Sequence, residues 1–290
     1  MKIIIIIALL LLGSTAVVFA TPNPVNMVYV EVNTNNITNV ACYLRKDNGQ
    51  PFFNIVSVFA ANIHGDDPNA PQIYFNQKVD QLLNHSDAIQ QLHAKGIKVL
   101  ITLLGDRQNA GWSCMTDPAA AATFANNIAA MLNKYQADGV DIDDEYSLCT
   151  FNPTSITMIA QALKTNPAFK GKLLTMALYG DEADFETAYN GHKLAEYLDY
   201  GWEMDYGNSS FDGRLAPYLQ NGMTKNNLTI GASTLVNYPS AADVVEYLQS
   251  NHYSNSMIYN ITAASDSEGY AEQFTTADGV PVTVPLGCLQ

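Results

Sequence analysis

Eight short runs rich in Val, Ile, Leu and Tyr recur along the chain, with helix-like stretches between several of them. Runs of this length, bounded by polar residues and Gly or Pro, are typical of buried β-strands. The pattern predicts strands near residues 28–32, 55–61, 98–104, 139–143, 173–178, 200–204, 228–232 and 256–259.

The segments between these runs carry helical signals of different strength. Apolar residues at helical spacing predict helices over residues 76–95, 118–136, 154–165 and 241–251. The first helix is expected to stop at Gly96, and the second opens with Asp117 as an N-cap and Pro118 at the first helical position. The segments after the fifth and sixth strands are expected to be short and weakly helical.

Strand–helix alternation repeated eight times over about 250 residues is the signature of a (β/α)₈ TIM barrel. We therefore expect residues 21–290 to form a single (β/α)₈ domain. A doubly wound open sheet is the structural alternative. However, the sequence contains no GxGxxG or GxxxxGK[ST] phosphate loop that would support nucleotide use.

The first 20 residues have the pattern of a secretory signal, because Lys2 precedes an apolar run and Ala20 ends a stretch of small residues suited to cleavage. We expect secretion; the alternative is an uncleaved membrane anchor.

The whole chain has 14 Lys and Arg against 28 Asp and Glu, a net charge of −14, which argues against nucleic-acid binding. Only 14% of residues are charged, so much of the surface must be neutral and polar.

Four cysteines are present, and an even number in an oxidising compartment suggests disulfides. No CxxC or Cys/His spacing predicts a structural zinc site. In a closed barrel the loops after strands three and four are neighbours, which predicts Cys114–Cys149. Closure also places strands one and eight side by side, which predicts Cys42–Cys288.

The segment Asp138-Gly139-Val140-Asp141-Ile142-Asp143-Asp144-Glu145 carries the most chemical information. On a strand, Asp141, Asp143 and Glu145 point to one face, while Val140, Ile142 and Asp144 point to the other. In a barrel the apolar side faces the helices, so the three acids line the interior and climb toward the C-terminal mouth. Like charges buried together raise one another's pKa, which predicts a shared-proton triad with Glu145 placed to donate. The alternatives are a solvated acidic turn or a divalent-cation site, but the spacing does not fit a DxDxDG calcium loop.

This segment fits the DGxDxDxE signature of glycoside hydrolase family 18, and the wider sequence resembles the endoglycosidase H type of endo-β-N-acetylglucosaminidase within it. The similarity extends through residues 29–33, 59–63, 96–100 and 104–111, and weakens after about Gly180. The resemblance implies Glu145 as acid/base, Asp143 as the residue that orients the substrate N-acetyl group, and Asp141 as its buried partner. Tyr206 resembles the family tyrosine that bonds the reacting acetamide.

In that family the acetamido oxygen of the substrate is the nucleophile, so the resemblance implies a retaining reaction that needs no metal and no cofactor. The sequence departs from the chitinase branch, which usually ends strand eight with tryptophan and places an acid or amide after the strand-six tyrosine. Here Tyr259-Asn260 and Gly207 occupy those places. These differences favour a compact hydrolase that acts on N-linked glycans. The resemblance alone implies high-mannose or hybrid glycans, and nothing in the sequence requires a dimer, so we expect a monomer. A chitinase and an inactive, lectin-like barrel are the alternatives.

Further residues are expected at the barrel mouth, where substrate contacts occur. Trp112 could stack a sugar ring or plug its loop, and Trp202 could pack inward or form a pocket floor. His64 and Asp181 are weaker candidates near the ends of strands two and five. The full set of expected substrate contacts is Tyr29, Glu31, Asn33, Asn62, Trp112, Tyr179, Trp202 and Tyr259.

Overall fold

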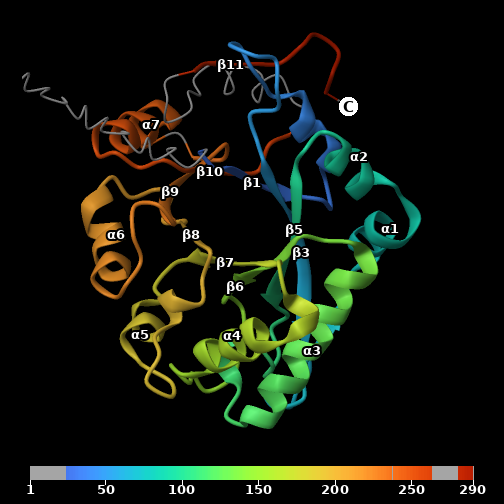
Figure 1. The fold of residues 1–290 in the computed structure, drawn as a ribbon, viewed down its shortest axis with the longest axis vertical. Helices are drawn as coiled ribbons and strands as arrows, with labels where there is room; N and C mark the ends of the chain where they lie inside the picture. The colour runs from blue at the N-terminus through green and yellow to red at the C-terminus, as the bar shows by residue number, and fades with distance from the viewer. Residues whose placement is uncertain (1–23, 237, 263–279, 290) are drawn as a thin grey trace, which may run out of the picture.

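The computed structural model describes residues 24–236, 238–262 and 280–289, and the expected signal at residues 1–20 lies outside them. Eight parallel strands form a closed barrel, with helices packed around its outside (Figure 1). Closure follows from β1, which pairs with β10 on one side and β3 on the other, so the open-sheet alternative is wrong. The barrel strands are β1 (Asn26–Glu31), β3 (Ile55–His64), β5 (Lys98–Gly105), β6 (Gly139–Asp143), β7 (Leu173–Leu178), β8 (Tyr200–Glu203), β9 (Leu228–Ser233) and β10 (Ser256–Tyr259).

All eight predicted barrel strands are therefore confirmed, three of them with the predicted bounds. Alternation along β6 is also as predicted. Val140 and Ile142 are fully buried in the large apolar cluster between strands and helices. Asp141 points the other way, opposite Thr102 and Thr175 in register. The strand thus directs its acids into the barrel.

The helices α3 (Pro118–Tyr135), α4 (Ser155–Thr165) and α7 (Ala241–Ser250) confirm three predicted segments. A single helix over 76–95 is wrong, because the segment forms α1 (Gln77–His85) and α2 (Ala88–Ala94). The break falls at Ser86 and Asp87. Ser86 donates to the carbonyl of Leu82 and accepts from the amide of Ala88, and such local side-chain bonds compete with a continuous helix.

Alternation of strand and helix is incomplete in this barrel. The strand β1 is followed by the 3₁₀ helix η1 (Ile37–Cys42) and the strand β2 (Leu44–Arg45), which pairs with β11 (Val282–Thr283). The segment after β7 is short, as predicted, with α5 (Glu182–Glu186) and the 3₁₀ helix η4 (Leu194–Glu196). The segment after β8 forms the ten-residue α6 (Phe211–Gln220), which contains Gly213 and Pro217, residues of low helix propensity.

The remaining elements are small. The strand β4 (Gln72–Tyr74) pairs antiparallel with the end of β3, and the 3₁₀ helices η2 (Trp112–Cys114) and η3 (Pro167–Phe169) lie in loops. No helix within the described parts of the chain combines the length and the apolar character that a membrane span requires.

Both predicted disulfides are confirmed. Cys114–Cys149 joins the loops after β5 and β6 with a Cα–Cα distance of 5.6 Å, and Cys42–Cys288 joins chain positions 246 residues apart. The first bridge ties together the two loops that follow the third and fourth barrel strands. It therefore stabilises the loop that continues from the acidic strand.

Replacing Cys114 and Cys149 together with Ser should lower the free energy of unfolding by about 4 kcal/mol, because the bridge closes a loop with a sequence separation of 35 residues. Denaturant unfolding of the double variant and of the parent, both without reductant, measures this loss. An unchanged transition midpoint would contradict it.

Candidate active site

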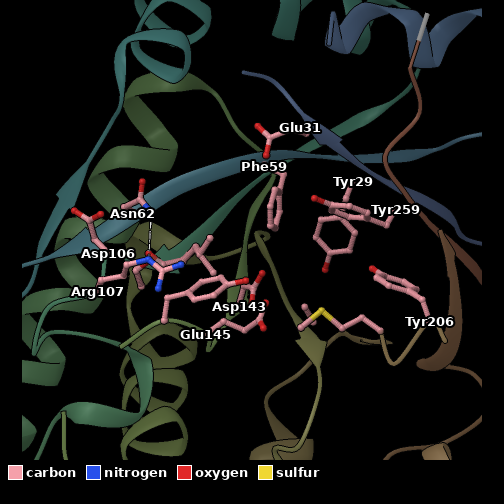
Figure 2. A pocket seen from close by; sticks show the side chains of 15 residues that line it. Tyr29, Glu31, Phe59, Asn62, Asp106, Arg107, Asp143, Glu145, Tyr206 and Tyr259 are labelled. Atoms are coloured by element: carbon pink, nitrogen blue, oxygen red, sulfur yellow. Dashed lines mark hydrogen bonds between the residues drawn. The ribbon is translucent and has the colours of Figure 1, made fainter. Parts of the chain in front are cut away.

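The cleft at the C-terminal ends of the barrel strands has a volume of about 490 Å³. Figure 2 shows Asp143 and Glu145 facing the rings of Tyr29, Tyr206 and Tyr259 across it. The lining residues come from strands and loops all around the barrel: Tyr29, Glu31, Phe59, Asn62, Leu104, Gly105, Asp106, Arg107, Asp143, Glu145, Tyr146, Ala177, Met204, Tyr206 and Tyr259.

Asp141 lies beneath the cleft, fully buried in the barrel interior. Its carboxylate accepts hydrogen bonds from the hydroxyl of Thr102, at 3.0 Å, and from that of Thr175. Burial raises the pKa of Asp141 to about 6, and the bonds from these hydroxyls oppose the rise. Asp141 is thus a fixed acid with satisfied polar atoms and no exposure to the cleft.

Asp143 ends β6 one step nearer the mouth and is only 1% exposed. Neither carboxylate oxygen has a hydrogen-bond partner among the described residues. Burial raises the pKa of Asp143 well above its ordinary value, and the charges of Glu145 and Asp141 add to the rise. A buried carboxyl without protein partners at the wall of a cleft is available to a polar group that enters the cleft.

Glu145 lies just beyond the strand, half-buried in the cleft wall. Its carbonyl accepts from the amide of Gly105 at 3.1 Å, and the carbonyl of Tyr146 accepts from the amide of Arg107 at 2.8 Å. The first contact needs glycine, because a Cβ on Gly105 would lie 2.3 Å from the Glu145 carbonyl. Burial, followed by the charge of Asp144, raises the pKa of Glu145.

Aromatic rings from β1, β3 and β10 and from the loop after β8 form the opposite wall. Tyr206 stacks on Tyr259 with centroids 5.8 Å apart, and Phe59 meets both Tyr29 and Tyr259 edge to face. The buried hydroxyl of Tyr29 interacts with Asp141 and opposes the rise in the pKa of that carboxyl. The Tyr206 hydroxyl lies 3.9 Å from the sulfur of Met257, a weak acceptor, so it can bond a group in the cleft.

Sequence reasoning missed the residues that hold Tyr206. Glu203 and Arg214 form a buried ion pair in which the Arg214 Nε donates to Glu203 Oε2 at 2.6 Å. The other Glu203 oxygen accepts from the amide of Asp205, and Arg214 also donates to the carbonyl of Asn208. These bonds fix the loop on both sides of Tyr206. An acid in the last residue of a barrel strand and an Arg in the following helix are the only sequence signals for this pair.

Three residues of the predicted catalytic group line the cleft: Asp143, Glu145 and Tyr206. The fourth, Asp141, lies directly beneath it. Of the expected substrate contacts, Tyr29, Glu31, Asn62 and Tyr259 line the cleft. Asn33 and Tyr179 are exposed but do not line it. The weaker candidates also lie outside the lining: His64 bonds Asp106 at 2.7 Å, and Asp181 is buried.

Neither tryptophan makes the substrate contact for which it was included among the expected contacts; Trp112 plugs its loop and Trp202 packs inward, the alternatives that the sequence also offered. Trp112 is fully buried against Phe124, and its Nε1 donates to the carbonyl of Leu103 at 2.7 Å. Trp202 is fully buried in the barrel interior, where it stacks on Tyr200. Neither ring has a face open to the cleft, because the barrel packing covers both.

The cleft residues Asp106, Arg107 and Tyr146 were not predicted from the sequence, although they follow the ends of β5 and β6, where barrel sites lie.

Trp112→Ala should lower the free energy of unfolding by about 3–5 kcal/mol, as expected for removal of a fully buried aromatic ring. Tyr179→Ala is the matched control, since Tyr179 is 56% exposed and its loss should change stability by less than about 0.5 kcal/mol. Denaturant unfolding of both variants compares them. Equal effects would show that Trp112 is not part of the core.

A closed parallel barrel whose fourth strand and the residues just after it direct acids toward an aromatic-walled cleft is the arrangement expected of a glycosidase. The chain matches the family model for glycosyl hydrolases family 18 over residues 25–276. It belongs to that family, as the DGxDxDxE signature indicated.

Two curated relatives are both named endo-beta-N-acetylglucosaminidase. The chain is 34% identical over 254 residues to an endo-beta-N-acetylglucosaminidase of Flavobacterium sp. (strain SK1022), covering 83% of this chain and 77% of the relative. It is 32% identical over 190 residues to endo-beta-N-acetylglucosaminidase F1 of Elizabethkingia meningoseptica, covering 62% of this chain and 56% of that relative. This chain therefore spans little more than half of the second relative's length.

Solved structures share the fold. EndoBT-3987 of Bacteroides thetaiotamicron, solved with a Man9GlcNAc2Asn substrate, superposes with a TM-score of 0.76 at 22% identity, over 92% of this chain and 68% of that one. A Group IV chitinase of Ostrinia furnacalis superposes with a TM-score of 0.60 at 15% identity, over 88% of this chain and 97% of that one. At these identities the likeness concerns the barrel alone.

Proposed function

We propose that the chain is an endo-β-N-acetylglucosaminidase that hydrolyses the β-1,4 bond between the two core N-acetylglucosamines of N-linked glycans. The reaction leaves one sugar on the asparagine. The observation that carries the proposal is Asp143: a buried carboxyl without protein partners that lines the cleft beside Glu145. The names of two curated relatives support the same activity.

Glu145 is the proton donor in this proposal. It lines the cleft, and burial raises its pKa, so a larger fraction keeps its proton near neutral pH. Its main chain is tied to the loop after β5, which fixes the position of the carboxyl relative to the cleft. The proton passes to the glycosidic oxygen as the bond to the anomeric carbon breaks.

Asp143 orients the substrate acetamide. The acetamido oxygen attacks the anomeric carbon, the leaving sugar departs with the proton of Glu145, and an oxazolinium ring forms. Asp143 bonds the acetamide N–H and offsets the positive charge that develops on the ring. Tyr206 donates a hydrogen bond to the acetamide oxygen from the facing wall. Asp141 lies beneath Asp143 as its buried partner. Water then opens the ring with Glu145 as base, so the anomeric configuration is retained.

The finer properties belong to the same proposal. We infer a preference for high-mannose or hybrid glycans from the resemblance to the endoglycosidase H type. We also propose secretion as a monomer after cleavage behind Ala20, supported by the sequence pattern of the first 20 residues. N-terminal sequencing of the secreted protein should begin at Thr21.

One assay tests the activity. The purified protein is incubated separately with a high-mannose glycoprotein and with chitin oligomers, and the products are analysed by mass spectrometry. We expect the glycoprotein to lose its glycan except for one N-acetylglucosamine per site. Shortening of the chitin oligomers alone would replace the proposal with a chitinase. Binding of glycan without any cleavage would indicate an inactive, lectin-like barrel.

A further inference from the structure

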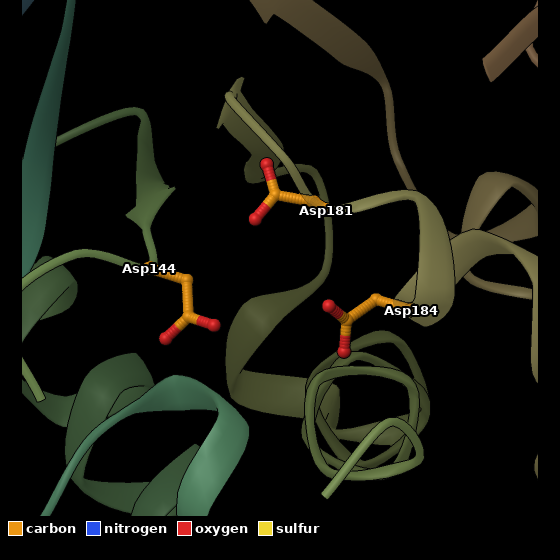
Figure 3. Close-up of side chains that lie close together, drawn as sticks. All are labelled: Asp144, Asp181 and Asp184. Carbon is orange, nitrogen blue, oxygen red and sulfur yellow. The ribbon is translucent and has the colours of Figure 1, made fainter. Parts of the chain in front are cut away.

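Three aspartates outside the cleft lining converge at the mouth of the barrel. Asp144 follows β6, Asp181 follows β7, and Asp184 lies in α5. One carboxylate oxygen from each lies within 4.8 Å of the others. Figure 3 shows the three carboxylates directed toward a common point, with Asp184 facing the other two.

Asp184 is the residue that points to a ligand. It is 1% exposed, and neither of its carboxylate oxygens has a hydrogen-bond partner among the described residues. The other two acids have few partners: the amide of Ser113 donates to Asp144 at 3.3 Å, and that of Tyr179 donates to Asp181 at 2.6 Å. None of the three forms an ion pair with a Lys, Arg or His in the described part of the chain.

Such a group is stable only if its charge is neutralised, either by protons or by a cation. Protonation alone would neutralise the charge, but it would leave Asp184 without a partner at hydrogen-bond distance among the described residues. A cation would neutralise the charge and also occupy the unpartnered oxygens.

We propose that Asp144, Asp181 and Asp184 bind a hard divalent cation, and that this cation is Ca²⁺. Carboxylate oxygens are the ligands that Ca²⁺ and Mg²⁺ prefer, and Ca²⁺ accepts them at 2.3–2.6 Å in flexible geometry. Two ligands on opposite sides of one Ca²⁺ lie about 4.6–5.2 Å apart by these distances. The three oxygens, all within 4.8 Å of one another, are close enough together for one Ca²⁺ to contact them all. Mg²⁺ requires a tighter group of ligands.

The sequence predicted no metal, so this site is additional to the predicted catalytic residues. Asp144 stands between Asp143 and Glu145 in the chain, so a bound Ca²⁺ would connect the loop after β6 to the start of α5. It would thereby stabilise the segment that carries both acids of the cleft. The binding can be measured without substrate, so this inference does not depend on the proposed function.

Calorimetric titration of the full-length, chelator-treated protein with CaCl₂ tests the proposal directly. We expect one Ca²⁺ per chain with a dissociation constant below about 10⁻³ M, the upper end of extracellular calcium sites. Ca²⁺ should also raise the melting temperature. Asp184→Asn should weaken Ca²⁺ binding at least about tenfold, because it removes a charged ligand. Glu246→Gln is the matched control, since it removes one exposed acid on α7 and should leave binding unchanged.

Three outcomes would overturn the proposal. The first is no Ca²⁺ binding by the parent protein, a result that does not depend on whether any variant folds. The second is equal Ca²⁺ affinity in Asp184→Asn and the parent. The third is tighter binding of MgCl₂ than of CaCl₂ in the same titration, which would refute the assignment to Ca²⁺.

Discussion

Glu145→Gln should lower turnover by about 10² to 10⁴-fold, the contribution expected of a single general acid. The amide keeps the shape of the side chain but has no acidic proton to give to the leaving sugar. Because the main chain around Glu145 is held by the amides of Gly105 and Arg107, the cleft should keep its shape. Turnover on a high-mannose glycoprotein measures the loss, and calorimetry with released glycan should show that binding survives.

Glu31→Gln is the matched control for that variant. Glu31 lines the same cleft, but it lies at the end of β1 and its carboxylate accepts from the side-chain amide of Asn33 at 2.6 Å. The same chemical change there should lower turnover less than about tenfold, since Glu31 is not the proton donor. If Glu145→Gln were no slower than Glu31→Gln, the acid would have been assigned to the wrong residue.

The architecture of this barrel could be predicted because its signals are local. Apolar runs of four to eight residues fixed the strands, and the alternation of acids with Val140 and Ile142 fixed which face of β6 points inward. The two disulfides followed from closure, since closure determines which loops are neighbours. The same alternation and the family resemblance led to Asp143, Glu145 and Tyr206, which line the cleft, and to Asp141 beneath it; their catalytic roles stay a prediction.

The predictions that were wrong or missing concern side chains whose surroundings depend on contacts between distant segments. Trp112 stands on a mouth loop, where an aromatic can meet a sugar, but its ring is covered by Phe124 of α3. The ion pair of Glu203 and Arg214 joins β8 to α6, and no spacing in the sequence announces it. The third case is a set of aspartates from the loop after β6, the loop after β7 and α5, which only the barrel brings together: Asp144, Asp181 and Asp184. Local patterns cannot reveal which side chains a neighbouring element covers.

Asp143→Asn should fail on intact glycoprotein, with turnover lowered by about 10² or more, the scale of losing one electrostatic contact to the developing charge. Among the described residues neither oxygen of Asp143 has a hydrogen-bond partner, so both are available to the substrate acetamide in the proposed mechanism. An asparagine keeps the volume, but it cannot offset the positive charge of the oxazolinium ring. Binding of released glycan should remain, because the aromatic wall is unchanged.

A synthetic glycan oxazoline separates this role from a general loss of activity. The oxazoline already contains the ring whose formation Asp143 assists, so Asp143→Asn should still transfer the glycan to an N-acetylglucosamine acceptor, with Glu145 activating that acceptor. Glu145→Gln should transfer it poorly, since the base is missing. A thiazoline analogue of the ring should inhibit the parent enzyme. Equal failure of both variants on the oxazoline would show that Asp143 does more than assist ring formation.

The same mechanism restricts the identity of the intermediate. If the substrate acetamide is the nucleophile, no side chain of the protein becomes glycosylated at any point in the cycle, and the first product has the anomeric configuration of the substrate. Mass spectrometry of the parent enzyme quenched during turnover should therefore show no added sugar on Asp143, Glu145 or any other acid. A glycosyl ester on one of these residues, or an inverted anomer detected by NMR in the first product, would refute substrate assistance even if the cleaved bond were the one proposed.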